Sequence, residues 1–171
     1  MTNPAAQLLN ALPETDAQEA LARCCGSRRW VQGMVAARPY HSDRAMFEIA
    51  ERTWWDLEPD DWLDAFSHHP RIGERISERP ASATEHGWST TEQSGMDQAD
   101  REVHDAMVAR NLEYERRFGH VFLICATGRS GYEMLMALLT RLDNDPTDEL
   151  RVAAAEQAKI TRIRLEKLVD T

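Results

Sequence analysis

The sequence has few cysteines, no long apolar run and no excess of positive charge, and each absence excludes a class of protein. Its three cysteines, Cys24, Cys25 and Cys125, form neither a CxxC pair nor a zinc spacing, and no HExxH motif is present. We therefore expect reduced thiols and no metal site. The longest uninterrupted apolar run, residues 121–126, is far too short to cross a bilayer.

The charge balance is acidic, with 29 Asp and Glu against 20 Lys and Arg and a formal net charge of −9. Nucleic acids and anionic membranes bind clustered Lys and Arg, so we expect neither as the main partner. The N-terminus does not resemble a secretion signal, and the C-terminal LVDT is not a peroxisomal tripeptide, which together predict a cytoplasmic protein. The 171 residues suit one globular domain.

Helical signals dominate the chain, and they predict an all-α, single-domain bundle of about seven or eight helices over residues 1–171. Residues 71–88 lose this periodicity and are expected to form a long loop. The run 121–126 has no second strand-like partner, so we expect buried, irregular chain there. Trp54, Trp55 and Trp62 follow helical spacing and are expected in the core. The expected helices run from about Pro4 to Leu12, Asp16 to Cys24, Ser27 to Ala37, Ser42 to Leu57, Pro59 to Phe66, Asp97 to Phe118, Tyr132 to Asp143 and Asp148 to Val169.

The stretch HHPRIGE, residues 68–74, is the first candidate for chemistry. Proline disfavours the helical region for the residue before it, so His69 is expected just beyond a helix end, in extended geometry. An imidazole held there beside a carboxylate suits acid–base work near neutral pH. A lone histidine is more often structural, and the residues alone leave both interpretations open.

The stretch STTEQSG, residues 89–95, also has both a structural and a functional interpretation. Ser-x-x-Glu is a capping box, the more common role of such a string. Ser89, Glu92 and Gln93 on a short helical turn also suit hydrogen bonding to a ligand. Near the C-terminus, Arg162 and Arg164 are either surface charges or, where one points inward, a site for a substrate carboxylate.

Four stretches taken in order, SHHPRIGE, STTEQSGM, YERRFGHVFLICATG and EQAKITRIRL, resemble the OHCU decarboxylases of uric acid breakdown. Their substrate is 2-oxo-4-hydroxy-4-carboxy-5-ureidoimidazoline. The resemblance runs from about Pro39 to Leu168 and implies an all-helical, commonly homodimeric enzyme that acts without a cofactor or metal. One departure is FGHVF, in which His120 replaces an apolar residue that relatives often carry.

The resemblance implies a role for each matching residue. His69 is expected to be the catalytic histidine and Glu92 its carboxylate partner. Arg164, chosen over Arg162 by register alone, is expected to help bind the substrate. The other substrate-binding residues that it implies are Pro70, Ser89, Thr90, Thr91, Gln93, Phe122, Leu123, Ile124, Cys125 and Ala126.

The implied function is decarboxylation of this ureidoimidazoline to (S)-allantoin, with His69 as the acid–base residue. Two alternatives remain from the sequence. One is a noncatalytic helical interaction module, in which the histidine and the capping box are structural. The other is a related decarboxylase or lyase that acts on another ureido-heterocycle.

Overall fold

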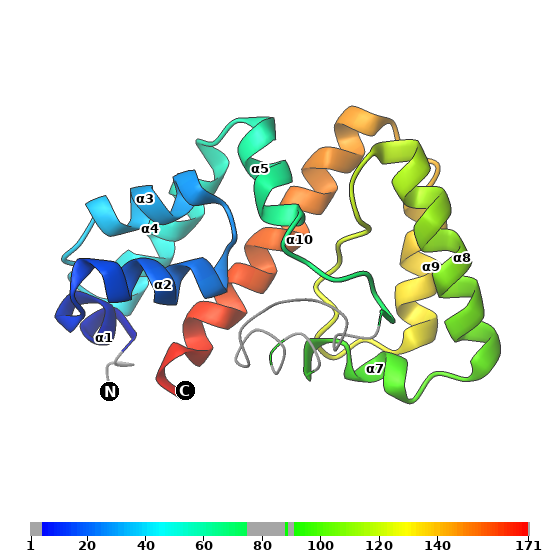
Figure 1. Cartoon of the computed structure of the whole chain (residues 1–171), viewed down its shortest axis with the longest axis horizontal. Helices are drawn as coiled ribbons and strands as arrows, with labels where there is room; N and C mark the ends of the chain where they lie inside the picture. The colour runs from blue at the N-terminus through cyan, green and yellow to red at the C-terminus, as the bar shows by residue number, and fades with distance from the viewer. Residues whose placement is uncertain (1–4, 75–87, 89–90, 171) are drawn as a thin grey trace. The chain divides into compact units, whose positions relative to one another are not determined.

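The computed structural model describes residues 5–74, 88 and 91–170, and every regular element in these ranges is helical (Figure 1). The predicted all-α class is confirmed, with nine α-helices in the described ranges, eight of them of seven or more residues. The chain divides into two compact units. The first combines Met1–Ala65 with Ala158–Thr171, and the second is Phe66–Gln157. The expected single domain over residues 1–171 stays a prediction, and each unit is described by itself.

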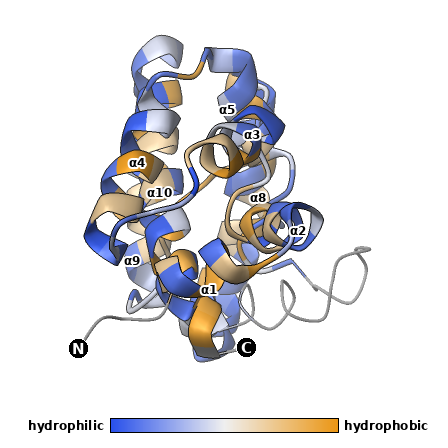
Figure 2. Cartoon of the chain, turned by 90° about the vertical axis from the view of Figure 1, so that its left-hand side faces the viewer, coloured by the Kyte–Doolittle hydropathy of each residue, from blue (hydrophilic) through white to orange (hydrophobic). Residues whose placement is uncertain are grey.

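The first unit is built mainly from the N-terminal helices α1 (Ala5–Ala11), α2 (Glu14–Cys24), α3 (Arg28–Ala36), α4 (Asp43–Trp55) and most of α5 (Pro59–Phe66). The end of α10 (Pro146–Glu166) and the 3-10 helix η2 (Lys167–Asp170) complete it. Helix α3 packs against both α2 and α4, and α1 contacts α2, α4 and η2. Figure 2 shows polar and apolar residues alternating around these helices, as expected where each buries one face.

Three of the predicted helix starts in this unit are confirmed, at Ser27, Ser42 and Pro59, and one is wrong. The Ser27 hydroxyl accepts from the Trp30 amide at 3.3 Å, and the Ser42 hydroxyl accepts from the Ala45 amide at 3.1 Å. Helix α2, however, begins at Glu14 rather than after Asp16. Asp16 lies in its first turn, where a negative charge complements the helix dipole without capping the helix.

The core of the first unit is formed by large apolar side chains from several helices. Trp30 is completely buried, and its indole nitrogen donates to the Ala50 carbonyl at 3.0 Å. Trp54 and Trp62 are buried as predicted, but Trp55 is 40% exposed, so its expected core role is wrong. A helical period of 3.6 residues cannot place two adjacent residues equally deep.

Cys24 and Cys25 lie in this core as free thiols. Burial raises the pKa of the Cys25 thiol to about 12, and it raises the pKa of Cys24 as well. Both thiols are therefore protonated at neutral pH and serve as small apolar core groups.

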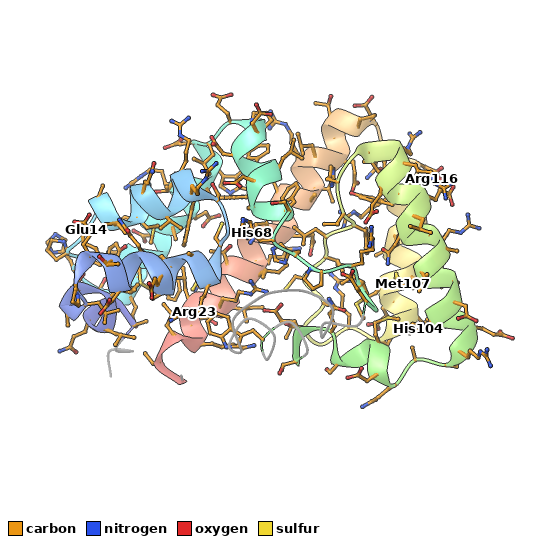
Figure 3. All side chains as sticks on the ribbon, viewed as in Figure 1. Glu14, Arg23, His68, His104, Met107 and Arg116 are labelled. Atoms are coloured by element: carbon orange, nitrogen blue, oxygen red, sulfur yellow. The ribbon has the colours of Figure 1, made fainter. Side chains whose placement is uncertain are left out.

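The second unit contains α7 (Ser94–Asp97), α8 (Arg101–Phe118), α9 (Gly131–Arg141) and the N-terminal part of α10. Helices α8 and α9 lie side by side, and α7 packs against α9 (Figure 1). Figure 3 shows Met107 on the core-facing side of α8 and Arg116 on its exposed side. The core is formed mainly by Met107, Tyr114, Phe122, Ile124, Met134 and Leu138.

Two helix starts in this unit differ from the sequence predictions. Helix α8 is capped by Asp100, whose carboxylate accepts from the Val103 amide at 2.9 Å, whereas Asp97 ends α7. Helix α10 begins at Pro146 instead of after Thr147, because the Asp145 carboxylate accepts from the Thr147 amide at 2.9 Å. The predicted stop at Gly119 is confirmed, with φ of 78°.

Within the described ranges, no helix combines the length and apolarity that a membrane span requires. In the same ranges, no group of three or more His, Cys, Asp or Glu side chains is arranged to hold a metal ion. Most of the predicted loop, from residue 75 to residue 87, lies outside the described residues.

Candidate active site

His69 lies just beyond the end of α5, as its pre-proline position predicts, and the chain bends there. The extended geometry expected of this residue stays a prediction. Its amide donates to the Phe66 carbonyl at 3.1 Å, which closes the turn that follows the helix. His69 is only 6% exposed, whereas the neighbouring His68 is exposed. The ring atom Nε2 lies 2.6 Å from Oε1 of Gln157 on α10, 88 residues away in the sequence. His69 is thus a buried imidazole with a defined hydrogen-bond partner.

The turn that follows His69 is attached to α8 at two points. The Arg71 guanidinium donates to both carboxylate oxygens of Glu115, at 2.7 and 3.0 Å. The Asn111 side-chain amide donates to the Ile72 carbonyl at 2.9 Å. Gly73 has φ of 83°, a conformation that favours glycine. The RIG sequence therefore has a structural role, because it fixes the chain that carries the histidine.

The segment expected to carry Ser89, Glu92 and Gln93 is only partly within the described residues. Ser89 and Thr90 lie outside them, so the capping box is not tested. Thr91 is exposed, and Glu92 is buried, with 8% of its surface accessible. The Gln93 side-chain oxygen accepts from the Gly73 amide at 3.0 Å, which ties this segment to the turn after His69. The pairing of Glu92 with His69 stays a prediction.

Residues 122–126 are buried, irregular chain, as predicted from the sequence, with Cys125 half-buried. Side chains take the place of a neighbouring strand in satisfying the backbone of this segment. The Leu123 carbonyl accepts from Arg141 at 2.7 Å, and the Cys125 amide donates to Glu156 at 2.7 Å. The Cys125 carbonyl accepts from Arg129 at 3.2 Å. Side chains of Arg141, Glu156 and Arg129 therefore fix the backbone of this segment. Its contact with a substrate stays a prediction.

A buried polar network lies behind this segment. The Glu149 side chain is completely buried and accepts from Arg141 at 2.7 Å and from the Tyr114 hydroxyl at 2.5 Å. The guanidinium of Arg141 also lies over the Phe122 ring, 4.6 Å from its centroid. Burial, followed by the hydrogen bond to Glu149, raises the pKa of Tyr114, so the hydroxyl remains a donor. The network links α8, α9 and α10 to residues 122–123.

His120, the departure from the family pattern, packs among aromatic rings instead of entering the solvent. Its ring centroid lies 5.3 Å from that of Phe66 and 5.5 Å from that of Tyr114. Nδ1 lies 3.0 Å from the Val121 carbonyl and donates to it. Burial lowers the pKa of His120, so the folded protein favours the neutral ring.

This depressed pKa predicts acid sensitivity that the variant His120→Phe lacks. Between the ordinary histidine pKa and the lower folded value, the unfolded chain binds the proton more readily, so the free energy of unfolding falls as pH falls through that window. We expect His120→Phe to lose less stability than the parent between about pH 7 and pH 5. Urea unfolding at both pH values measures this. The exposed His41, changed to Gln, is the control, and an unchanged slope in His120→Phe contradicts the prediction.

The two candidate arginines have different environments in the first unit. Arg164 is buried and donates to the Arg23 carbonyl at 3.3 Å, in the last turn of α2. Arg162 is on the surface, paired with Glu166 at 3.3 Å and stacked 4.4 Å from the Phe47 centroid. The environments agree with the choice of Arg164 as the inward-pointing residue, but substrate contact is not tested.

Glu156 and Gln157 contact the candidate site, although no sequence pattern predicted a role for them. Glu156 binds the Cys125 amide and Gln157 binds His69, so one turn of α10 reaches two parts of the candidate site. A signal for Gln157 was present in the sequence. It lies four residues after Ala153 and four before Thr161, in the middle of a stripe that is buried in the structure. A polar residue there needs a partner.

Comparison with known proteins gives one consistent result. Residues 10–166 match the family model for OHCU decarboxylase. The chain is 35% identical over 153 residues to the uric acid degradation bifunctional protein TTL of Arabidopsis thaliana, a match covering 85% of this chain and 45% of that protein. It is 34% identical over 102 residues to the 2-oxo-4-hydroxy-4-carboxy-5-ureidoimidazoline decarboxylase of Amia calva, covering 60% of this chain and 58% of that one. The matches thus span about half the length of these two relatives.

Two solved structures have the same fold. A crystal structure of OHCU decarboxylase in the presence of (S)-allantoin matches with a TM-score of 0.76 and 34% identity, covering 90% of this chain and 99% of that one. A crystal structure of (S)-allantoin synthase matches with a TM-score of 0.70 over all of this chain and 55% of the other. Its identity of 16% supports a shared fold alone.

Proposed function

Because the chain belongs to the OHCU decarboxylase family, we propose that it converts 2-oxo-4-hydroxy-4-carboxy-5-ureidoimidazoline to (S)-allantoin in uric acid breakdown. One observation supports this best: His69 is a buried imidazole in a fixed hydrogen bond, in the same unit as the buried Glu92 and residues 122–126. A buried, oriented imidazole is suited to moving a proton at neutral pH.

The proposed substrate supplies its own electron acceptor. Its carboxylate is bonded to a carbon that neighbours a C=N bond. When the bond to the carboxylate breaks, the electron pair forms a new C=C bond and the nitrogen takes up the charge, so that CO2 leaves an enol-like species. The protein must orient the carboxylate, stabilise the developing charge and deliver one proton to one face. No cofactor is needed for these steps.

In this proposal, His69 interacts with the substrate hydroxyl as the acid–base residue, and Glu92 is paired with it and stabilises the protonated ring. Gln93 and the backbone of residues 122–126 bind the ureido group and the ring. The hydrogen bonds that hold this segment in place support that role. A backbone that is already fixed needs little rearrangement to bind the substrate as charge develops. Further contacts are expected from Pro70, Ser89, Thr90 and Thr91. A proton delivered from a fixed side produces the (S) enantiomer.

Arg164 is proposed to anchor the substrate carboxylate, a role that rests on the family resemblance and agrees with its burial. Replacing Arg164 with Gln removes a charge-assisted hydrogen bond worth about 1.5–3 kcal/mol, so we expect KM to rise about 10- to 100-fold. Steady-state kinetics measure this, with Arg162→Gln as the matched control. Thermal unfolding of both variants accounts for the lost bond to Arg23. Equal KM values in the two variants argue against Arg164.

Two further properties belong to the proposal. We expect a homodimer, as the resemblance implies, and a cytoplasmic location, as the sequence of the two termini suggested. Light scattering of the purified chain measures the mass directly. A mass of one chain at micromolar concentration contradicts the dimer.

The test of the activity is optical. The unstable substrate is generated from urate with the upstream oxidase and hydrolase, and circular dichroism follows the appearance of allantoin. With this protein present, we expect rapid formation of the dextrorotatory product, against slow spontaneous decay in buffer. Decay at the buffer rate with a folded protein rules out this substrate.

A further inference from the structure

One partner of His69 is a neutral amide from a distant part of the chain. Gln157 is completely buried in the interior of α10, and its Oε1 lies 2.6 Å from Nε2 of His69. An amide oxygen carries no hydrogen and can only accept. The hydrogen in this bond therefore belongs to His69, which places a proton on Nε2 and leaves the lone pair of the neutral ring on Nδ1.

The position of Gln157 on α10 gives the bond a rigid base. Glu156, the preceding residue, accepts from the Cys125 amide at 2.7 Å. Adjacent residues point about 100° apart around a helix, so this single turn binds the histidine in one direction and residues 122–126 in another. Ala153 and Ala154, one turn earlier, are also completely buried. A change in the Gln157 side chain therefore cannot be relieved by movement into solvent.

We propose that Gln157 is a positioning residue that sets the tautomer and ring orientation of His69. An amide oxygen suits this task, because it accepts from Nε2 and so selects the tautomer without adding a charge of its own. The expected effect of Gln157 on kcat rests on the proposed decarboxylation. The assignment of the tautomer does not.

The tautomer is measured directly by 15N NMR of the histidine side chains, at about two pH units above the usual histidine pKa. The signals that are present in the parent protein and absent from His69→Asn belong to His69. In the parent protein we expect a protonated Nε2 and an unprotonated Nδ1. The opposite tautomer in the parent protein overturns the proposal, whether or not the chain decarboxylates anything.

Three variants test the role of the side chain. Gln157→Met keeps the length and removes the amide, and we expect averaged tautomers and a kcat lowered about 10- to 100-fold with little change in KM. Gln157→Glu keeps an acceptor oxygen, and we expect it to retain the protonated Nε2. Gln18→Met, at an exposed position on α2, is the control for the substitution itself.

The outcomes separate this inference from the proposed function. A parent protein with the expected tautomer but no decarboxylation refutes the activity and leaves the assignment of Gln157 intact. An active parent whose tautomer and kcat are unchanged in Gln157→Met overturns the positioning role. If Gln157→Met does not fold, the parent tautomer and its retention in Gln157→Glu decide the question.

Discussion

Replacing His69 with Asn is expected to lower kcat by about 100- to 10,000-fold while the helical fold remains, because general acid–base catalysis contributes about that factor. Asparagine preserves a polar side chain near Gln157, so the loss of hydrogen bonding at the buried position is smaller than for alanine. It cannot exchange a proton near neutral pH. The optical assay for allantoin gives kcat, and far-ultraviolet circular dichroism reports the fold.

The neighbouring histidine provides a matched control. His68→Asn makes the same chemical change one residue away, at an exposed position. We expect kcat of this variant to be within about two-fold of the parent, since exposed substitutions rarely perturb a site. Near-parental turnover in a folded His69→Asn protein removes His69 from the mechanism.

Of the variants proposed for this protein, Glu149→Gln is expected to lower the free energy of unfolding the most. Three donors converge on this completely buried carboxylate: the Arg141 guanidinium, the Tyr114 hydroxyl and, at 2.9 Å, the Asn144 amide. The variant leaves the charge of Arg141 buried without its counterion, and it turns one acceptor oxygen into an NH2 group that faces donors. Removing one partner of a buried ion pair costs about 3–5 kcal/mol.

For a chain of this size that cost corresponds to a fall in Tm of roughly 10 °C. Differential scanning calorimetry measures the shift. Glu166→Gln, which breaks the surface pair with Arg162, is the control and is expected to change Tm very little. Equal shifts in the two variants mean that Arg141 keeps adequate compensation without Glu149. The Arg141 contact to Leu123 predicts that residues 122–126 become less protected from hydrogen exchange in Glu149→Gln.

The sequence predicted the helices well where a local signal decides the boundary. The caps at Ser27 and Ser42 and the stop at Gly119 are confirmed, because each depends on atoms within a few residues. Three helix starts were wrong. At α8 and α10 a nearby residue of similar chemistry had been chosen, whereas α2 follows Pro13, which makes no side-chain cap. Asp97 and Asp100 are equally good caps by sequence. In the structure Asp97 is the last residue of α7, which packs against α9, and Asp100 caps α8.

In the candidate site, too, the sequence predicted the features that depend on neighbouring residues and missed those that depend on distant ones. The pre-proline position of His69 indicated an imidazole beyond a helix end, and the structure places it there. Its hydrogen bond to Gln157 joins residues 88 apart and has no local signal beyond a polar residue on a buried stripe. The role of Gln93 in holding the Gly73 amide was likewise outside the reach of sequence patterns.

By itself, the sequence determined the helical class, several helix ends and the candidate histidine, because periodicity, capping and proline geometry act over a few residues. Only the tertiary structure decided that α10 supplies the partner of His69, that Arg141 and Glu149 support residues 122–123, and that Arg164 is buried while Arg162 is exposed. The physical reason is that a buried polar group must find a partner wherever the fold provides one, and distance along the chain does not limit that choice.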